Sequence, residues 1–589
     1  MMSCDHARAD ACGATQSHFA CGDDDGSDEN TDEWSRNMTG DSGIANSASW
    51  ESNGVLVTLE HLVAGVWREV LATDQIGVHD HFFKLGGHSL LAMQMVARLR
   101  DRYGLSLTVE QVFKAPTIRK MTEMLSQAHP NRELEQIVRR ARPSTVPVSA
   151  MQEAHLKRCR DRGFVRFTDP EQNLCMGLTL TGELDAAALE RALKAICDRH
   201  ESLRTTFDTS TTPPSQVVHP PGRFEFTRVV DLSAISEPEQ PEALERAIEA
   251  AKKWVIDYIE GPQVQFTIIR LNPARHVLVM VTNELVLDLW SIGVLFDEMN
   301  NLYGASLRGE EVTLPVPLQY PDVIVWQRQQ MRENEQETLK YWKDVVDGAE
   351  TLGLKFPFAL PRPEKFEYRV GLVDFDLADL QPAVQRYCEA RSASIYSFYL
   401  ASYVVLLHAL SGAKRVYLYT PSAQRTRLEL ERVIGRLSRS LTVRFDVDAE
   451  GSFNELVDTV SQTVLRAQEK LNGVSAVRML ELLPKLDITK PVSYLGFTFD
   501  YHHQLRLPGV EASQFPISTH IGPWLDLNLR IAKKHDGTSA RLRYNIHSFT
   551  TETARHIMNA YIHGVRHVLS EGATPIREIV AKLDLAPLV

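Results

Sequence analysis

A serine preceded by two glycines is the first group in the sequence that could do chemistry. It lies in the run Leu85-Gly86-Gly87-His88-Ser89-Leu90, and the apolar residues spaced over 91–99 predict a helix that begins at Ser89. Glycines leave no side chain to crowd the approach, so the hydroxyl would stand on an accessible corner. The simpler interpretation is a helix cap, in which Ser89 accepts a hydrogen bond from a free backbone N–H. Spacing alone favours the cap.

The elements around Ser89 predict a small helical domain. Apolar residues recur at three- and four-residue spacing over 59–70, and a last helix begins at Thr117 with its apolar side facing inward. About 70 residues of short helices form a small bundle that has little room for a pocket of its own. Ser89 is therefore expected on the surface of this domain.

Residues 55–128 resemble a peptidyl carrier protein. The shared residues are Gly86-Gly87-His88-Ser89-Leu90, Asp80-His81-Phe82-Phe83 and Val112-Phe113. The resemblance implies an all-α four-helix carrier bundle in which a separate transferase attaches 4′-phosphopantetheine to Ser89, beside Gly87 and His88. Acyl groups would ride on the terminal thiol of this arm as thioesters. Ser89 would then be a modification site that needs no catalytic triad, and its phosphate would lie near a helix N-terminus, where the dipole favours negative charge.

Helical and strand patterns alternate over 148–580, which predicts two α/β lobes with a cleft between them. The clearest expected elements are an amphipathic helix over 186–196, a buried strand over 277–281, an apolar helix over 398–406, and strands over 416–419, 494–501 and 525–531. The large domain is therefore expected to be about six times the length of the small one.

The large domain resembles the condensation domain of nonribosomal peptide synthetases, a two-lobed α/β fold related to chloramphenicol acetyltransferase. The clearest match is Arg199-His200-Glu201-Ser202-Leu203-Arg204-Thr205-Thr206-Phe207, with partial matches over 149–152, 320–327 and 434–444. Taken singly, Glu201 and Arg204 are most simply a helix-end ion pair, and Tyr320 and Trp326 are packing residues. The set as a whole carries the resemblance.

The catalytic motif of that family is altered in this sequence. The family has two histidines, three further residues, Asp and Gly at the end of a buried strand, and its second histidine faces the point where donor thioester and acceptor amine meet. The matching signature segment here reads Thr282-Asn283-Glu284-Leu285-Val286-Leu287-Asp288-Leu289-Trp290-Ser291. Asn283 and Glu284 stand in place of the histidines, and Leu289 in place of the glycine. Asp288 matches, and the resemblance implies that it forms a structural ion pair with Arg425 from the other lobe.

These substitutions change the chemistry that the segment can supply. Aminolysis of a thioester needs a neutral amine, removal of its second proton and support for the developing oxyanion. A glutamate starts at a pKa of about 4.3, about two units below histidine, so Glu284 is a weaker base unless its apolar neighbours raise its pKa. Asn283 adds only a neutral donor and acceptor, and the larger Leu289 is expected to restrict the space beside the channel.

Two functions remain open at this point. In the first, the chain carries an aminoacyl or peptidyl thioester on Ser89, and the condensation-type domain forms an amide bond with Glu284, Asp288 and Asn283 as its catalytic residues. In the second, the large domain is a non-catalytic platform that recruits a trans-acting tailoring or loading enzyme to the tethered intermediate. A third possibility is that the carrier alone works and the large domain is a relic.

The resemblance also implies the partners. No adenylation domain precedes the carrier in this sequence and no thioesterase follows the large domain, so the Ser89 arm is expected to be loaded in trans. The expected partners are an adenylation protein, a phosphopantetheinyl transferase, other synthetase subunits of a peptide-antibiotic assembly line and, under the second hypothesis, a tailoring enzyme.

Composition excludes several other classes of protein. The chain has 589 residues, and its net charge of −12 argues against nucleic acid as a partner. No apolar run approaches the roughly 20 residues that cross a bilayer, and the polar N-terminus differs from a signal peptide, so a cytoplasmic location is expected. Seven cysteines without a CxxC pair fit neither a disulfide framework nor a zinc site. Reduced thiols and no metal are therefore expected.

Two segments lie outside the predicted domains. Residues 1–54 hold eleven Asp and Glu against two arginines, a net of −9 (2 − 11), and too few apolar groups to offset the entropy lost on ordering. They are predicted to be a disordered acidic tail. Prolines and arginines interrupt the apolar pattern over 129–147, which predicts a linker. This linker is expected to keep the Ser89 arm concentrated beside the large domain without fixing it there.

Overall fold

The computed structural model describes residues 49–585 with gaps, in a chain that forms two compact units, Met1–Thr58 and Leu59–Val589. The gaps are 53–54, 72, 86, 88, 106, 128–136, 138, 140–141, 144, 162, 165, 169, 171–172, 311–313, 362–368, 426, 472, 475, 485–491, 502–503, 516–524, 534–536 and 584. In the first unit, β1 (Ser49–Ser52) pairs antiparallel with β2 (Val55–Thr58). The predicted tail thus lies outside the described residues up to 48, and its residues 49–52 form a strand.

The predicted carrier domain is a bundle of four helices at the start of the second unit. They are α2 (Leu59–Leu71), α3 (Ser89–Tyr103), α4 (Val109–Lys114) and α5 (Ile118–Gln127). Their apolar sides meet in one core, where the Trp67 and Phe82 rings are fully buried and touch edge to face with 5.0 Å between centroids. The four-helix bundle expected from the sequence is confirmed.

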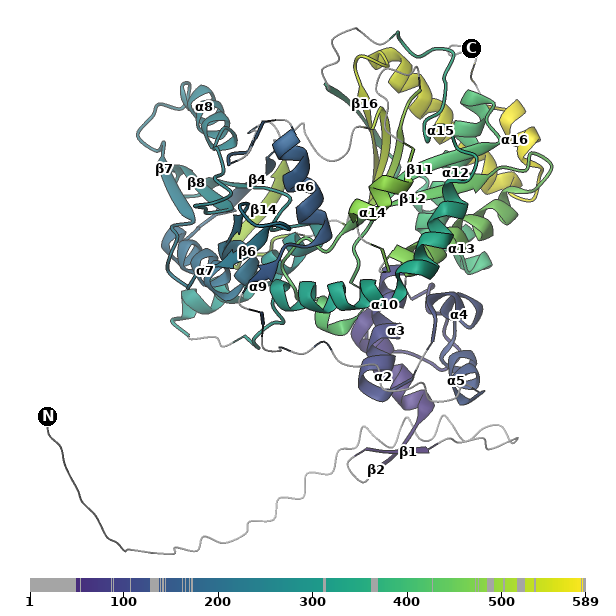
Figure 1. Ribbon diagram of the computed structural model, residues 1–589, viewed down its shortest axis with the longest axis horizontal. Coiled ribbons are helices and arrows are strands. Elements are labelled where there is room, and N and C mark those ends of the chain that lie inside the picture. The colour runs from purple at the N-terminus through teal and green to yellow at the C-terminus, as the bar shows by residue number, and fades with distance from the viewer. Residues whose placement is uncertain are drawn as a thin grey trace, which may run out of the picture. The chain divides into compact units, whose positions relative to one another are not determined.

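The first α/β lobe is built on a five-stranded sheet of order β14-β4-β9-β8-β7 (Figure 1). Its strands are β4 (Leu174–Gly182), β7 (Thr227–Asp231), β8 (Val264–Asn272), β9 (Arg275–Thr282) and β14 (Val510–Phe515). Its helices are α6 (Ala150–Asp161), α7 (Ala186–Arg199), α8 (Gln240–Lys252) and α9 (Leu289–Arg308). The strand predicted over 277–281 is confirmed as β9, which is buried along its length after Arg275 because apolar clusters cover both of its faces.

A small sheet of order β3-β6-β5 completes this lobe. It is formed by β3 (Val146–Pro147), β5 (Thr205–Asp208) and β6 (Ser215–Val218), with the short 3-10 helix η2 (Glu201–Arg204) leading into β5. The Glu201–Arg204 ion pair expected from the sequence is present, with 3.8 Å between its charged atoms.

The second α/β lobe is built on a six-stranded sheet of order β10-β16-β15-β13-β11-β12. Its strands are β10 (Val370–Asp376), β11 (Arg415–Ser422), β12 (Arg439–Asp446), β13 (Leu495–Tyr501), β15 (Leu527–Lys533) and β16 (Thr538–Asn545). Its helices are α10 (Tyr320–Val346), α11 (Gln381–Arg391), α12 (Ile395–Ser411), α13 (Phe453–Leu471), α14 (Ala476–Leu482), α15 (Thr551–Glu571) and α16 (Ile576–Ala581), with the 3-10 helix η3 (Leu428–Leu430) between β11 and β12. The two-lobed α/β fold expected from the sequence is confirmed.

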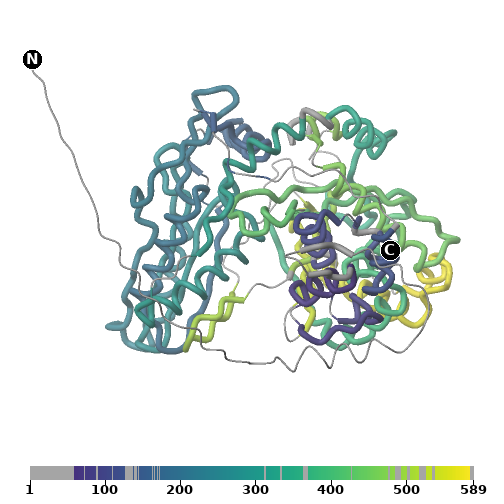
Figure 2. Tube along the Cα trace, turned by 90° about the horizontal axis from the view of Figure 1, so that it is seen from below, coloured from purple at the N-terminus to yellow at the C-terminus, as the bar shows by residue number. Residues whose placement is uncertain are grey.

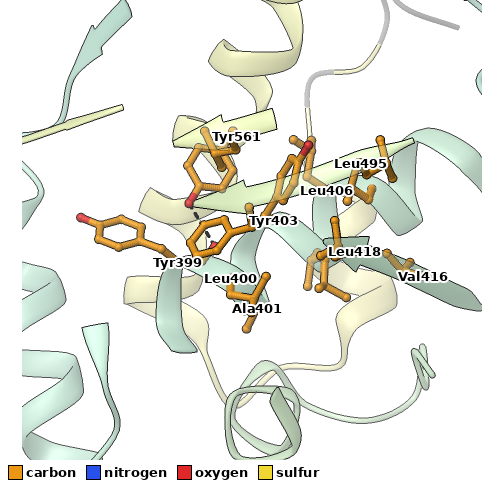
Figure 3. Packing of buried hydrophobic residues seen from close by; sticks show 14 of the residues in the cluster. Tyr399, Leu400, Ala401, Tyr403, Leu406, Val416, Leu418, Leu495 and Tyr561 are labelled. Carbon is orange, nitrogen blue, oxygen red and sulfur yellow. Dashed lines mark hydrogen bonds between the residues drawn. The ribbon is translucent and has the colours of Figure 1, made fainter. Parts of the chain in front are cut away.

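Helix α12 forms the centre of the second lobe. It is apolar on almost every side, which fits a helix surrounded by other elements. Figure 3 shows Tyr399 and Tyr403 of α12 beside Tyr561 of α15, whose hydroxyl donates to the Tyr399 carbonyl at 3.1 Å. No single helix among the described residues is long and apolar enough to cross a bilayer; α11 and α12 pass that test together, but only as a pair bent by 106°.

Among the described residues, two segments that follow strands of the second lobe cross over to contact the first lobe. Strand β14 follows β13 of the second lobe in sequence, yet it pairs with β4 of the first, as Figures 1 and 2 show. The second crossing is the loop over 423–438 between β11 and β12, which we call the crossing loop. Its Ile434 is buried in the core of the first lobe, where the Ile434 carbonyl accepts the Ser202 hydroxyl at 2.7 Å. The crossing loop is thus held against the end of β9, where the signature segment begins.

Described residues in the second half of the linker are attached to the large domain; the expectation that the linker does not fix the Ser89 arm stays a prediction. Ile137 is buried against Tyr320 and Leu430, and its N–H donates to Glu429 at 3.2 Å. Arg142 donates to Asp322 at 2.6 and 3.0 Å and to Glu201 at 2.5 Å. The sequence showed only that the apolar periodicity breaks here. One buried apolar residue, Ile137, and one arginine with two acidic partners, Arg142, nevertheless anchor the segment.

Cys159, Cys175, Cys197 and Cys388 are free thiols in the part of the chain that the structure describes. Burial raises the pKa of Cys175 to about 11 and that of Cys388 to about 12, so neither is a reactive thiolate at neutral pH. Cys4, Cys12 and Cys21 lie outside the described residues.

Candidate functional site

Ser89 is the first residue of α3, at the end of the helix where the dipole is positive. The position two residues before it requires a glycine, because a Cβ on Gly87 would overlap the ring and the carbonyl of Phe82. The Gly87 N–H also donates to that carbonyl at 2.9 Å, which fixes the approach to the helix. Gly86 and His88 lie outside the described residues. The backbone therefore offers a helix N-terminus that fits a phosphodiester on Ser89.

Asn283 follows the last residue of β9 in the signature segment, and its side chain is buried and bonded at both ends. Its Nδ2 donates to Gln263 at 2.9 Å, and its Oδ1 accepts the Leu285 N–H at 2.8 Å. These bonds hold the turn that follows β9. Both polar ends of the Asn283 side chain are thus bonded within the protein, and its expected catalytic role stays a prediction.

Asp288 is the best-bonded carboxylate of the signature segment. It caps α9 by accepting from Ser291, and it accepts from Arg425 Nη1 at 2.5 Å and Nη2 at 3.0 Å. The backbone N–H groups of Leu437 and Ser438 at the end of the crossing loop donate to it as well. Burial opposes its ionisation, but the charge of Arg425 outweighs burial and lowers the pKa of Asp288. The expected ion pair between Asp288 and Arg425 is present.

Glu284 follows Asn283 in the signature segment, and its carboxylate is bound by Arg436 of the crossing loop. The same guanidinium donates to the Glu284 carbonyl at 3.1 Å. Burial opposes ionisation here too, but Arg436, with smaller effects from His155 and Arg158, lowers the pKa of Glu284 to about 2. The sequence left open that apolar neighbours raise this pKa. That idea is wrong, because the positive charge of Arg436 outweighs the effect of burial on the Glu284 pKa. The motif gave no sign of this arginine.

A histidine from a different element lies beside Glu284. Helix α6 packs on the signature segment, where Gln152 donates to the Leu285 carbonyl at 2.8 Å. His155, one turn further along α6, places its Nδ1 3.8 Å from the Glu284 carboxylate and 3.5 Å from an Arg158 nitrogen. Sequence reasoning missed both His155 and Arg436. The available signals were the three-residue spacing from Gln152 and the position of Arg436 next to Gly435, and neither indicates a contact with Glu284.

Leu289 lies at the surface, and the restriction of the channel expected from its size stays a prediction. It is the first residue of α9 and keeps 47% of its surface exposed. The next residue, Trp290, does face the protein: its indole Nε1 donates to the Glu431 carbonyl at 2.8 Å, and the Arg425 guanidinium lies 5.8 Å from its ring centre. The signature segment and the crossing loop are therefore bonded along their length.

Comparisons with known proteins agree with both parts of the fold. The phosphopantetheine attachment site family matches residues 61–125, and the condensation domain family matches residues 170–584. A linear gramicidin synthase protein of Brevibacillus parabrevis is 32% identical over 518 residues, which are 85% of this chain and 10% of that protein. Surfactin synthase subunit 1 of Bacillus subtilis (strain 168) is 28% identical over 413 residues, 69% of this chain and 11% of that protein. The chain thus spans about a tenth of the length of these relatives.

Solved structures share the fold of the large domain. The X-domain from teicoplanin biosynthesis has a TM-score of 0.63 and 24% identity, covering 76% of this chain and 100% of that one. The same domain, solved in complex with OxyB, gives a TM-score of 0.63 at 23% identity over 77% of this chain and 98% of that one. The condensation domain of the Monacolin K polyketide synthase MokA has a TM-score of 0.62 at 18% identity, covering 74% and 99%. The chain belongs to the condensation-domain family of nonribosomal peptide synthetases, and a domain that bears covalent 4′-phosphopantetheine precedes its condensation domain.

Proposed function

We propose that this chain holds an aminoacyl or peptidyl thioester on a phosphopantetheine arm at Ser89 and presents it beside a condensation-fold domain that does not use Glu284 as a base. The large domain then serves as a platform at which a trans-acting tailoring or loading enzyme meets the tethered intermediate. The arm itself supplies the thiol that carries the acyl group.

The start of α3 supports Ser89 as the attachment point. The family match over 61–125 contains it, and the clash that a side chain at Gly87 would make with Phe82 explains why the residue before His88 is a glycine. The backbone N–H groups of the first turn of α3 would hold the phosphate oxygens of the arm. Gly87 positions the turn, and Ser89 provides the oxygen that takes up the group.

The binding of Glu284 by Arg436 is the observation that carries the platform proposal. A general base for amine deprotonation works best with a pKa near the operating pH, and the Glu284 carboxylate, with a pKa of about 2, has almost no affinity for a proton there. The ion pair gives Glu284 a different task, because it joins the signature segment of one lobe to the crossing loop of the other. Asp288 and Glu284 thus each form an ion pair that joins the two lobes, and neither residue supplies the proton-accepting imidazole of a histidine.

A second candidate function keeps amide formation and rests on His155. Its Nδ1 lies 3.8 Å from the Glu284 carboxylate and 3.5 Å from an Arg158 nitrogen. In that case His155 accepts the proton that the amine loses, and Glu284 acts through it by stabilising the imidazolium. This differs from the first hypothesis drawn from the sequence, in which Glu284 itself was the base.

One experiment separates the two candidates. The full chain is converted to its phosphopantetheine form with a transferase and coenzyme A, loaded with a donor aminoacyl group, and mixed with an acceptor carrier bearing a free amine. Mass spectrometry of the acceptor arm measures new amide in the parent chain, in Glu284→Gln and in His155→Asn. The platform proposal expects no amide above the uncatalysed rate in all three.

Amide that disappears in His155→Asn would overturn the platform and support the second candidate, and amide that disappears in Glu284→Gln alone would restore the glutamate base.

A second experiment tests the platform directly and asks whether the same loaded chain retains a tailoring or loading enzyme from the synthetase. Retention that requires the large domain supports the platform, and retention by the carrier domain alone contradicts it. The OxyB complex shows that a domain with this fold can be bound by a separate protein in the teicoplanin case.

The proposal also sets the partners. An adenylation protein would load the arm, a phosphopantetheinyl transferase would install it, and further synthetase subunits would donate or receive the chain in the cytoplasm. The activities of the longer relatives are proposals for this chain, because it spans about a tenth of their length.

A further inference from the structure

The crossing loop contacts the carrier bundle as well as the signature segment. Arg98 of α3 donates two hydrogen bonds to Glu431, from Nη1 to Oε1 and from Nη2 to Oε2, each 2.9 Å long. Asp101, three residues further along α3, accepts the Leu428 backbone N–H at 3.1 Å. Residues three apart share one face of a helix, so a single face of α3 binds both a charged side chain and a backbone N–H of the loop.

The Arg98–Glu431 pair has the geometry of a specific contact. Each side chain is only 12% exposed, and the two parallel bonds require the planar guanidinium and the carboxylate to lie in one plane. Ion pairs that remain in water contribute little, but a pair withdrawn from water leaves an uncompensated charge when either partner is removed. Glu69 of α2 also accepts from Arg98 Nε at 2.9 Å, which orients the guanidinium toward the loop.

The same loop anchors the linker, and this shortens the tether of the carrier. Helix α5 ends at Gln127, and Ile137, the first linker residue that the structure describes, is bound to the large domain through Glu429 and the apolar cluster around Leu430. The ten residue steps between Gln127 and Ile137 span at most about 36 Å when fully extended. A short tether gives a high effective concentration of the carrier near its anchor, so a modest contact is enough to hold it.

The docked position is connected to the signature segment through one residue. The Glu431 side chain binds Arg98 of the carrier, while the Glu431 carbonyl accepts the indole N–H of Trp290 at 2.8 Å. The carrier therefore rests on the side of the crossing loop whose backbone also holds Trp290, two residues after Asp288.

We propose that the crossing loop is the docking site of the chain's own carrier domain, recognised through Arg98–Glu431 and Asp101–Leu428, and that the anchored linker confines the carrier to this face. A trans-acting enzyme must then come to the docked carrier, because the carrier cannot travel far from the loop. This inference goes beyond the proposed function, since it holds whether or not the large domain forms amides.

The Leu428 amide gives a direct readout in the full chain, because its N–H is bonded to the carrier. Hydrogen–deuterium exchange with residue-level fragmentation compares the parent chain with Arg98→Glu, Glu431→Arg and the double variant that exchanges the two charges. We expect exchange at Leu428 to accelerate by at least about tenfold in each single variant and to return toward the parent rate in the double variant. Unchanged exchange in both single variants would overturn the proposal, as would a double variant no better than the singles.

Arg102→Glu is the matched control on the same helix. Arg102 binds Glu69 inside the bundle, so its reversal changes the charge of α3 equally without removing a bond to the crossing loop. Leu428 exchange is expected to stay near the parent rate in this variant, and modification of Ser89 by the transferase checks that each bundle is folded. Acceleration in Arg102→Glu equal to that in Arg98→Glu would overturn the specific role of Arg98.

A mixing arm distinguishes docking within one chain from docking between chains. The Arg98→Glu chain keeps Glu431, and the Glu431→Arg chain keeps Arg98, so a mixture offers one intact pair between chains. Docking within the chain predicts that Leu428 of the Arg98→Glu chain stays fast in the mixture. Recovered protection there would show that a second copy supplies the carrier and would overturn confinement by the linker.

Discussion

The start of α3 and the signature segment differ in what holds their residues in place. At α3, where we propose that Ser89 takes up the prosthetic group, Gly87 fits tightly against Phe82. In the signature segment, Asp288 is bonded to Arg425 and caps α9, and these bonds hold the two lobes together. A motif combines residues that do chemistry with residues that hold shape, and the contacts of each residue separate the two kinds.

Two carboxylates within the signature segment make the comparison sharper. Asp288 is 3% exposed and accepts bonds from side chains and backbone of two lobes, whereas Glu284 is 26% exposed and is bound mainly through Arg436. Both pKa values are lowered by an arginine of the crossing loop. The charge state of each carboxylate is therefore set by the arginine opposite it, and not by its position in the motif.

The largest expected effect concerns the carrier half of the comparison. Ser89→Ala removes the oxygen that takes up the phosphopantetheine group, so intact mass after treatment with transferase and coenzyme A should show no added group. Thr117→Ala, elsewhere in the bundle, is expected to accept the group fully. Modification that persists in Ser89→Ala would show that another residue is the attachment point.

The next effect is the loss of Asp288. Asp288→Ala leaves Arg425 buried without its partner, and we expect a loss of about 3–5 kcal/mol in the free energy of unfolding of the large domain. Denaturant unfolding followed by circular dichroism measures the change. A loss below about 1 kcal/mol would show that Asp288 does not hold the lobes together.

Glu284 should contribute less stability than Asp288, with a distinct pH dependence. Its pKa falls from 4.5 to about 2 on folding, so its contribution is complete above pH 4.5 and disappears as the pH falls toward about 2. We expect on the order of 2–3 kcal/mol to be lost across that range in the parent chain and not in Glu284→Gln. Parallel stability profiles for the two chains would contradict the ion pair with Arg436.

The smallest effect is expected at Leu289. Nearly half of its surface is exposed, so Leu289→Ala should change the free energy of unfolding by no more than about 0.5 kcal/mol. A buried leucine would cost about 2–5 kcal/mol in the same exchange. A loss in that higher range would mean that Leu289 packs into the protein after all.

The sequence predicted the elements that have a strong local pattern. The apolar stripe of α2, the continuous apolar run of β9 and the apolar helix α12 were all expected from periodicity, because each pattern is set by the environment of its own element. The ion pair of Asp288 with Arg425 followed from the family resemblance. None of these required knowledge of a contact between unrelated segments.

The contacts that decide the chemistry could not be predicted in this way. Arg436, His155 and the anchoring of Ile137 all depend on which distant segments meet, and a lone arginine, histidine or isoleucine has no local pattern that names its partner. The direction of the Glu284 pKa shift could therefore not be predicted from the sequence. Burial raises this pKa and an opposite charge lowers it, and the sequence did not show that Arg436 supplies that charge.

The most direct test of the account is the titration of the Glu284 side chain in the folded chain. Carbon-13 NMR of labelled glutamate carboxyls, assigned with Glu284→Gln, follows its charge as the pH is varied. The account predicts that the Glu284 signal stays at the position of an ionised carboxylate from about pH 8 down to about pH 5, because Arg436 holds its pKa near 2. A midpoint between about pH 6 and pH 8 would make Glu284 a base poised for catalysis and would contradict the platform.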